Sequence, residues 1–136
     1  MLSADAVQKF FTEMFPQSTA AIQQAGEGRA RVRQIIDHQH LRPGGTVSGP
    51  VMMAVADWAA YAAILAEIGI VPLAVTTSLN INFLRRPSPQ RAIIGEARLL
   101  KLGRRLAVAE VNIFSEGESA LVAHATLTYS IPPRGE

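Results

Sequence analysis

Residues 44–58 read GGTVSGPVMMAVADW and open the most hydrophobic segment of the chain. Pro50 suits the first turn of a helix, because its fixed φ is helical and its missing N–H would have no partner there. Gly69 is placed to end that helix. The helix predicted over residues 50–68 is apolar on nearly every side, so other parts of the chain must wrap it. Asp57 is the one carboxylate inside its apolar run.

The apolar run, residues 50–66, is shorter than the roughly 20 residues that a membrane-spanning helix needs. Asp57 lies near its middle, where a charge is costly in lipid. We therefore expect a helix buried in protein and no membrane partner. The N-terminal sequence MLSADAVQKFFTEMF, residues 1–15, lacks the basic and then apolar regions of a secretory signal.

The composition suits a single folded domain. The chain has 136 residues, of which 49% are hydrophobic and 18% charged, so it can fill a core and does not resemble a disordered segment. The formal net charge of +2 is too small to indicate nucleic-acid binding. The absence of cysteine excludes disulfides, thiolate zinc sites and cysteine nucleophiles, and it fits a cytoplasmic protein.

The segment before the long helix predicts one short helix and one strand. Residues 3–15 read as an amphipathic helix that Ser3 caps. Its apolar side chains at helical spacing are Val7, Phe10, Phe11 and Met14. Residues 18–28 form a polar connection with room for another helical turn. Residues 29–37 read as a strand, and residues 38–47 as a glycine-containing loop.

The segment after the long helix predicts an antiparallel sheet. Apolar and polar residues alternate from Val75 to Phe83, with Thr77 on the apolar face. Three further strands follow, separated by turn signals: residues 91–102, 104–114 and 119–131. Consecutive long strands with tight turns predict a curled sheet rolled around the apolar helix, which is an α+β domain. Residues from 132 onward form a short tail.

Three stretches carry a resemblance to a known family. They are GGTVSGPVMMAVAD (residues 44–57), AVTTSLNINFLRRP (residues 74–87) and ARLLKLGRRLAVAEVNIF (residues 97–114). In this order they resemble the hotdog-fold acyl-CoA thioesterases of the phenylacetate-pathway and 4-hydroxybenzoyl-CoA type. The resemblance implies one hotdog domain over residues 1–136, with an N-terminal helical segment over residues 1–27 and a hotdog core over residues 28–131.

Asp57 is the first candidate catalytic residue. A carboxylate in an apolar helix is costly unless it is paired or hydrogen-bonded, which fits either a structural contact or a functional site. The resemblance implies the functional role, as a general base for water or as a nucleophile on a thioester carbonyl.

Gly49 is the second candidate. A helix N-terminus presents free N–H groups, and a glycine lets a substrate approach them. The resemblance implies that the Gly49 N–H holds the thioester oxygen. Gly49 and Asp57 are eight positions apart, or about 12 Å along a helix, too far for one chain to supply both easily. We therefore expect a two-fold homodimer with antiparallel central helices and a shared site, and the resemblance implies a dimer of dimers.

The start of the helix departs from the family pattern. Ser48-Gly49-Pro50 stands where the family usually has His-Gly-Gly, and Arg42 stands where it often has an asparagine. Arginine cannot accept a hydrogen bond, but it can bind a carboxylate or a phosphate. We assign Arg42 and Ser48 to substrate binding.

Other residues are assigned by the resemblance to substrate binding or left as ordinary surface. Thr76 and Thr77 lie where the family often has a hydroxyl that orients water, although threonine is also common in strands. Trp58 would shape the acyl pocket together with methionines of the long helix. The remaining candidates, either a solvated rim or ligands of the coenzyme A phosphates, are Arg85, Arg86, Arg104 and Arg105.

The sequence therefore predicts an acyl-CoA thioesterase that needs no metal or redox cofactor, with coenzyme A as part of the substrate. His38, His40 and His124 lack the spacing of a metal site. Two alternatives stay open: a non-catalytic acyl-CoA-binding hotdog protein, and an acyl-thioester dehydratase or hydratase. The acyl group is not specified by the sequence.

Overall fold

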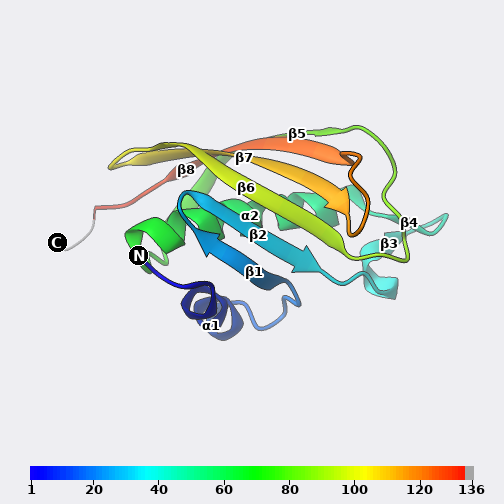
Figure 1. Cartoon of the computed structure of the whole chain (residues 1–136), viewed down its shortest axis with the longest axis horizontal. Helices are drawn as coiled ribbons and strands as arrows, with labels where there is room; N and C mark the ends of the chain where they lie inside the picture. The colour runs from blue at the N-terminus through cyan, green and yellow to red at the C-terminus, as the bar shows by residue number, and fades with distance from the viewer. Residues whose placement is uncertain (134–136) are drawn as a thin grey trace.

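The structure, a computed structural model that describes residues 1–133, is a six-stranded antiparallel sheet over one long helix (Figure 1). The strands lie across the sheet in the order β1 (Ala21–Gly26), β2 (Arg29–Gln34), β6 (Ile93–Leu102), β7 (Leu106–Ser115), β8 (Ala123–Ser130) and β5 (Val75–Phe83). The helices are α1 (Ala4–Met14), the short 3₁₀ helix η1 (His38–His40) and the long α2 (Gly49–Ile68). A small ladder of β3 (Leu41–Arg42) and β4 (Thr46–Val47) lies at one end. The predicted α+β class is confirmed, and residues 134–136 of the predicted tail lie outside the described residues.

The predicted central helix is confirmed as α2. Ser48 caps it, because its hydroxyl accepts a hydrogen bond from the Val51 N–H at 3.3 Å. Gly69 ends it with a φ of 90°, a value that favours glycine. The helix is long and apolar enough to cross a membrane, but 61% of its most apolar window is buried inside the protein. α2 is therefore a core helix wrapped by the sheet.

Small side chains let the sheet approach α2 closely. Alanines dominate the buried face of the helix, and further alanines face it from the strands. Gly95 in β6 lies at the closest approach, because a Cβ placed on it would be 2.8 Å from Cγ1 of Val55 and 3.6 Å from Cβ of Ala59. No side chain fits there without a shift of the helix or the strand.

Gly95→Ala is therefore expected to destabilise the protein by about 1–3 kcal/mol, the usual cost of overpacking a core. Urea denaturation of both proteins measures this difference. Val55→Ala removes the clashing methyl groups, so the double variant should be more stable than the sum of the two single changes predicts. Additive losses would show that Gly95 is not in tight contact with Val55.

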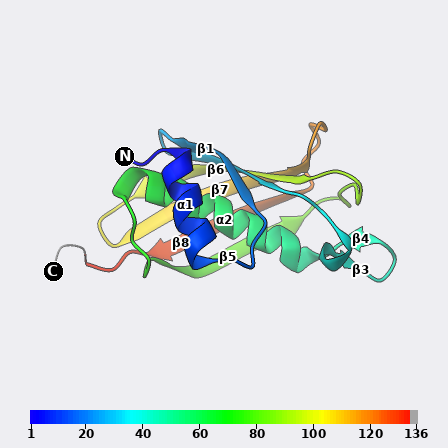
Figure 2. The same cartoon turned by 90° about the horizontal axis from the view of Figure 1, so that it is seen from below.

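The N-terminal region is partly as predicted. α1 is confirmed, with the Ser3 hydroxyl accepting from the Ala6 N–H at 3.1 Å, and it crosses α2 on the side away from the sheet (Figure 2). Phe11 is buried against α2, but Met14 is 55% exposed, so its assignment to the apolar face was wrong. The helical turn expected within residues 18–28 was also wrong. Pairing with β2 through a turn of positive-φ residues makes this segment the strand β1.

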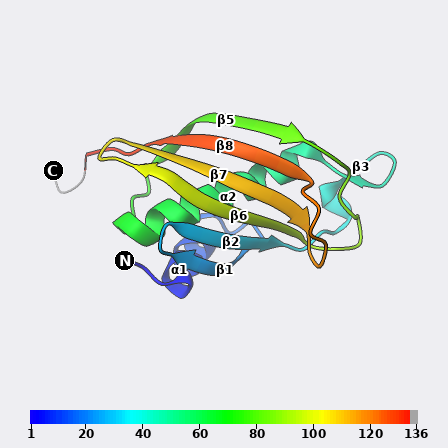
Figure 3. The ribbon, with the colours of Figure 1, turned by 45° about the horizontal axis from the view of Figure 1, so that its top comes forward.

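The predicted strand Val75–Phe83 is confirmed as β5, but its alternation is not strict. A bulge between Thr76 and Ser78 shifts the register with β8, so Thr76 faces α2 while Thr77 is exposed. The assignment of Thr77 to the apolar face was therefore wrong. Among residues 1–133, β5 pairs with β8 alone, and its other edge has no neighbouring strand (Figure 3).

Candidate active site

Asp57 lies in the middle of α2, half-buried, and its carboxylate has two hydroxyl partners. The Thr76 hydroxyl donates a hydrogen bond to Oδ1 of Asp57 at 2.6 Å. The Tyr129 hydroxyl donates to the same oxygen. The structure therefore brings the predicted residues Asp57 and Thr76 together, and the carboxylate's place in an apolar helix is compensated by hydrogen bonds.

Tyr129 was missed in the sequence. It lies on β8, whose buried residues alternate as Ala123, Ala125, Leu127 and Tyr129. It is the only residue of that inward row with a polar group, and a buried tyrosine hydroxyl usually has a partner. That signal points to a polar contact under the sheet, but it does not identify Asp57 as the partner.

Both tyrosines near Asp57 are held in their neutral form. Burial, and then the charge of Asp57, raise the pKa of Tyr61 to about 12. Burial, and then the charge of Asp57 and its hydrogen bond, raise the pKa of Tyr129 far above its usual range. Both hydroxyls therefore remain hydrogen-bond donors throughout the neutral pH range.

The raised pKa of Tyr61 predicts a loss of stability at high pH. Below pH 10.0 the ring is protonated in both states, whereas between 10.0 and about 12 only the unfolded state releases the proton. The free energy of unfolding should therefore fall with rising pH in this window, by about 1.4 kcal/mol per pH unit from this group. Urea denaturation of wild type and Tyr61→Phe measures it: the wild-type curve should fall more steeply. Parallel curves would contradict the prediction.

A cavity of about 440 Å³ opens beside Asp57. Its apolar walls include Phe15 and Trp58, whose ring centroids are 4.8 Å apart, and Pro72. Trp58 also packs on Phe11 at 5.1 Å. The predicted residue Trp58 thus lies beside the carboxylate, and Phe15, at the end of α1, contributes an aromatic wall that the sequence did not indicate.

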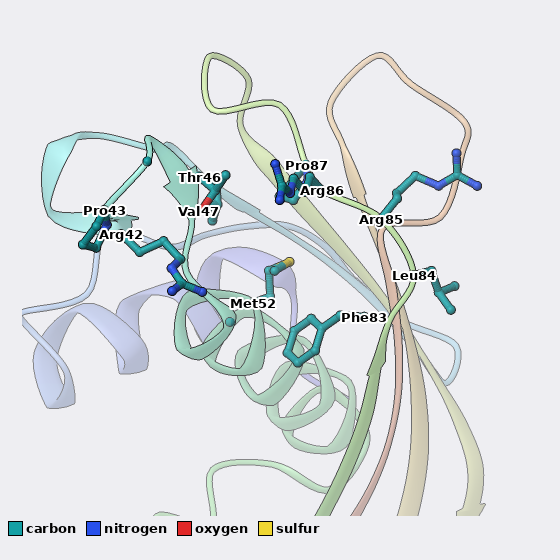
Figure 4. Close-up of a pocket in the computed structure, with 12 residues that line it drawn as sticks. Arg42, Pro43, Thr46, Val47, Met52, Phe83, Leu84, Arg85, Arg86 and Pro87 are labelled. Atoms are coloured by element: carbon teal, nitrogen blue, oxygen red, sulfur yellow. The ribbon is translucent and has the colours of Figure 1, made fainter.

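A second cavity, of about 680 Å³, lies at the N-terminus of α2 (Figure 4). Gly49 lines it, and within residues 1–133 the Gly49 N–H has no hydrogen-bond partner. A Cβ on Gly49 would be 3.3 Å from Cζ of Phe83, so a larger residue would crowd the cavity. The Ser48 hydroxyl is engaged in capping α2. A free N–H at a helix N-terminus can bind a negatively charged or polarised oxygen.

Three of the predicted arginines line this second cavity in different ways. Arg42 extends toward the start of α2, and Arg86 lies at the opposite wall (Figure 4). Arg85 points away, and its Nε donates to the Leu121 carbonyl at 2.9 Å. Arg104 and Arg105 lie in the β6–β7 turn at the other end of the sheet, so one chain does not bring them to this cavity (Figure 1).

The predicted site is divided within one chain. The Asp57 cavity and the Gly49 cavity have no lining residue in common. Thr77 reaches neither, since its hydroxyl donates to the Thr128 carbonyl at 3.2 Å. In the part of the chain that the structure describes, no group of three or more histidine, aspartate or glutamate side chains could hold a metal ion.

The chain is similar to a known protein family and to several solved structures. A family model described as the thioesterase superfamily matches residues 44–122. A candidate thioesterase from Silicibacter sp. TM1040 is 47% identical, with 98% of this chain and 94% of that chain covered and a TM-score of 0.90. No curated protein matches the chain.

Solved structures with lower sequence identity share the same fold. Zebra fish thioesterase superfamily member 2 is 26% identical, over 97% of this chain and 100% of that chain, with a TM-score of 0.86. A variant of the phenylacetic acid degradation protein from Thermus thermophilus is 27% identical, over 90% of this chain and 98% of that chain, with a TM-score of 0.75. These neighbours support the predicted hotdog architecture.

Proposed function

This chain belongs to the thioesterase superfamily, and we propose that it hydrolyses acyl-CoA thioesters at a site that two copies of the chain build together. The family makes it a thioester hydrolase. The observation that carries the finer proposal is the division of the site: a hydrogen-bonded carboxylate in one cavity and an unpaired backbone N–H in another, on the same helix.

Two uncovered surfaces support a two-fold partner. One is the free edge of β5, which can pair with another strand. The other is a stripe on α2 at helical spacing, formed by the exposed residues Pro50, Met53 and Ala54 and the half-buried Asp57. Antiparallel pairing of two β5 strands would extend the sheet and set two α2 helices antiparallel beside each other. We further propose that such dimers associate into a dimer of dimers.

In that arrangement Gly49 of one copy approaches Asp57 of the other. The Gly49 N–H would donate a hydrogen bond to the thioester oxygen and stabilise the negative charge that grows there. Asp57 would take a proton from the attacking water, and the C–S bond would then break to release coenzyme A as a thiolate. The proposed chemistry uses no metal and no redox cofactor.

The substrate's two ends would bind different surfaces. The aromatic wall formed by Phe15 and Trp58 is suited to the acyl group. Arg42 and Arg86 are suited to the coenzyme A phosphates, because guanidinium groups bind them in a fork. Antiparallel pairing would also bring the partner's Arg104 and the partner's Arg105 to the same end of the sheet.

A thiol-release assay tests the function. Wild type and Asp57→Ala are assayed against a panel of aryl and aliphatic acyl-CoAs at equal dimer concentration. We expect wild-type turnover that selects one acyl class and is lost in the variant. Micromolar binding of acyl-CoA without turnover on any member would instead favour a binding protein and overturn the proposal.

A further inference from the structure

We propose that Tyr129 is a positioning residue for Asp57: its hydroxyl and that of Thr76 hold Oδ1, which leaves Oδ2 as the oxygen that acts on the substrate or on water. The inference rests on the proposed hydrolytic role of Asp57 and adds a residue to it. Nothing in the sequence motifs assigned a role to Tyr129.

The two hydroxyls converge on one carboxylate oxygen. Thr76 and Tyr129 are directly paired across β5 and β8, so their side chains leave the sheet side by side toward α2. Thr76 donates to Oδ1 of Asp57 at 2.6 Å, and Tyr129 donates to the same atom. Within residues 1–133, Oδ2 receives no hydrogen bond from the protein. One oxygen is therefore fixed and the other is available.

The phenol of Tyr129 is itself held in place. The residue is 3% exposed, and its ring stacks on Tyr61 with centroids 5.7 Å apart and planes 13° apart. Tyr61 stacks in turn on Phe11 at 5.6 Å, and its hydroxyl lies 3.2 Å from the Val71 carbonyl, to which it donates. A ring packed in this way cannot turn its hydroxyl away from Asp57 without disturbing the core.

The direction of the hydrogen bond is fixed by charge. Burial and the nearby Asp57 raise the pKa of Tyr129, so its hydroxyl keeps its proton and donates it. The hydroxyl also lies 3.2 Å from the main-chain oxygen of Asp57, a second acceptor on the same residue. The Tyr129 hydroxyl is thus within hydrogen-bonding distance of both the side chain and the backbone of Asp57. These contacts limit rotation of the carboxylate about χ1 and χ2.

This constraint matters for rate more than for binding. A carboxylate that samples several rotamers spends less time aligned with the attacking water, and a displacement of about 1 Å can lower turnover by roughly 10²-fold. Tyr129 lines the Asp57 cavity and not the Gly49 cavity, where the thioester oxygen would bind, and Tyr129→Phe keeps the ring in place and removes only the hydroxyl. Its loss should therefore lower kcat and leave KM nearly unchanged.

The test compares Tyr129→Phe with Tyr61→Phe, using the acyl-CoA that wild type hydrolyses fastest. Each variant loses one hydroxyl from a buried ring of the same stack, but the Tyr61 hydroxyl bonds backbone carbonyls instead of Asp57. We expect kcat of Tyr129→Phe to fall by about 10- to 100-fold at nearly constant KM. Tyr61→Phe should lose a similar amount of thermal stability and much less kcat.

A second pair of variants tests the other hydrogen bond to Oδ1 of Asp57, which Thr76 donates. Thr76→Val removes the second donor and should also lower kcat, whereas Thr76→Ser retains a hydroxyl and should restore most of it. Equal kcat losses in Tyr129→Phe and Tyr61→Phe would reduce Tyr129 to a structural role and overturn the inference while the proposed function stands. An absence of turnover in wild type would overturn the proposed function itself, and this inference with it.

Discussion

Asp57→Asn is expected to lower the turnover of an acyl-CoA thioester by about 10²- to 10⁴-fold, the range that a positioned general base contributes. The amide has nearly the shape of the carboxylate, and its oxygen can still accept from Thr76 and Tyr129. It cannot take a proton from water or attack a carbonyl. The loss should therefore appear in kcat, measured by thiol release, in a protein that keeps its fold.

Glu67→Gln is the matched control for this change. Glu67 is the other acidic residue of α2, and its Oε1 accepts a hydrogen bond from the Gly28 N–H at 3.0 Å. The glutamine oxygen can keep that hydrogen bond. The variant therefore tests whether the loss of one negative charge on α2 is enough to lower turnover. Asp57→Asn with near-wild-type turnover, or an equal loss in Glu67→Gln, would contradict a catalytic role for Asp57.

Gly49→Pro is expected to have the second-largest effect, a fall in kcat of about 10²-fold or more, as for removal of one oxyanion donor. Proline deletes the N–H that the thioester oxygen would use. The fold can accept it, because Gly49 is the first helical residue and Ser48 already has the extended backbone, with ψ 150°, that precedes proline. Thermal melting of the variant checks that the helix start survives.

Gly49→Ala separates the lost donor from added bulk. Both substitutions place a Cβ about where Phe83 limits the cavity, at 3.3 Å from Cζ of that ring, but alanine keeps the N–H. The loss in Gly49→Pro should therefore clearly exceed the loss in Gly49→Ala. Equal losses would attribute the effect to crowding and remove the oxyanion role.

The sequence predicted the helices and strands that are specified by residues close together in the chain. The central helix has a proline in its first turn and a glycine at its end, and both lie where the sequence predicted them, whereas the cap at Ser48 was not predicted. β1 was missed because Ala21–Gly26, AIQQAG, shows no clear alternation of apolar and polar residues and becomes a strand by pairing with β2. The face of Thr77 was missed because a bulge arises from pairing with β8, which alternation cannot predict.

The candidate site was predictable only in part. Asp57 stands out because a lone carboxylate is unusual in an apolar segment, and Gly49 because it directly precedes the proline that marks the helix start. Tyr129 lies 72 positions from Asp57 in the chain, so only the sheet's topology brings its hydroxyl to the carboxylate. The same topology sets Arg104 and Arg105 at the far end of the sheet from Arg86, a separation that the sequence does not reveal.

Mixed dimers of Asp57→Asn and Gly49→Pro chains test the shared site most directly. The two chains carry different affinity tags, are co-expressed, and are purified over both tags, which enriches oligomers whose dimers contain one chain of each kind. A shared site predicts about half of the wild-type turnover per dimer, because one of its two sites then combines an intact Gly49 with an intact Asp57. A mixed dimer as inactive as the two parent variants would contradict the shared site, and place both groups' chemistry within one chain.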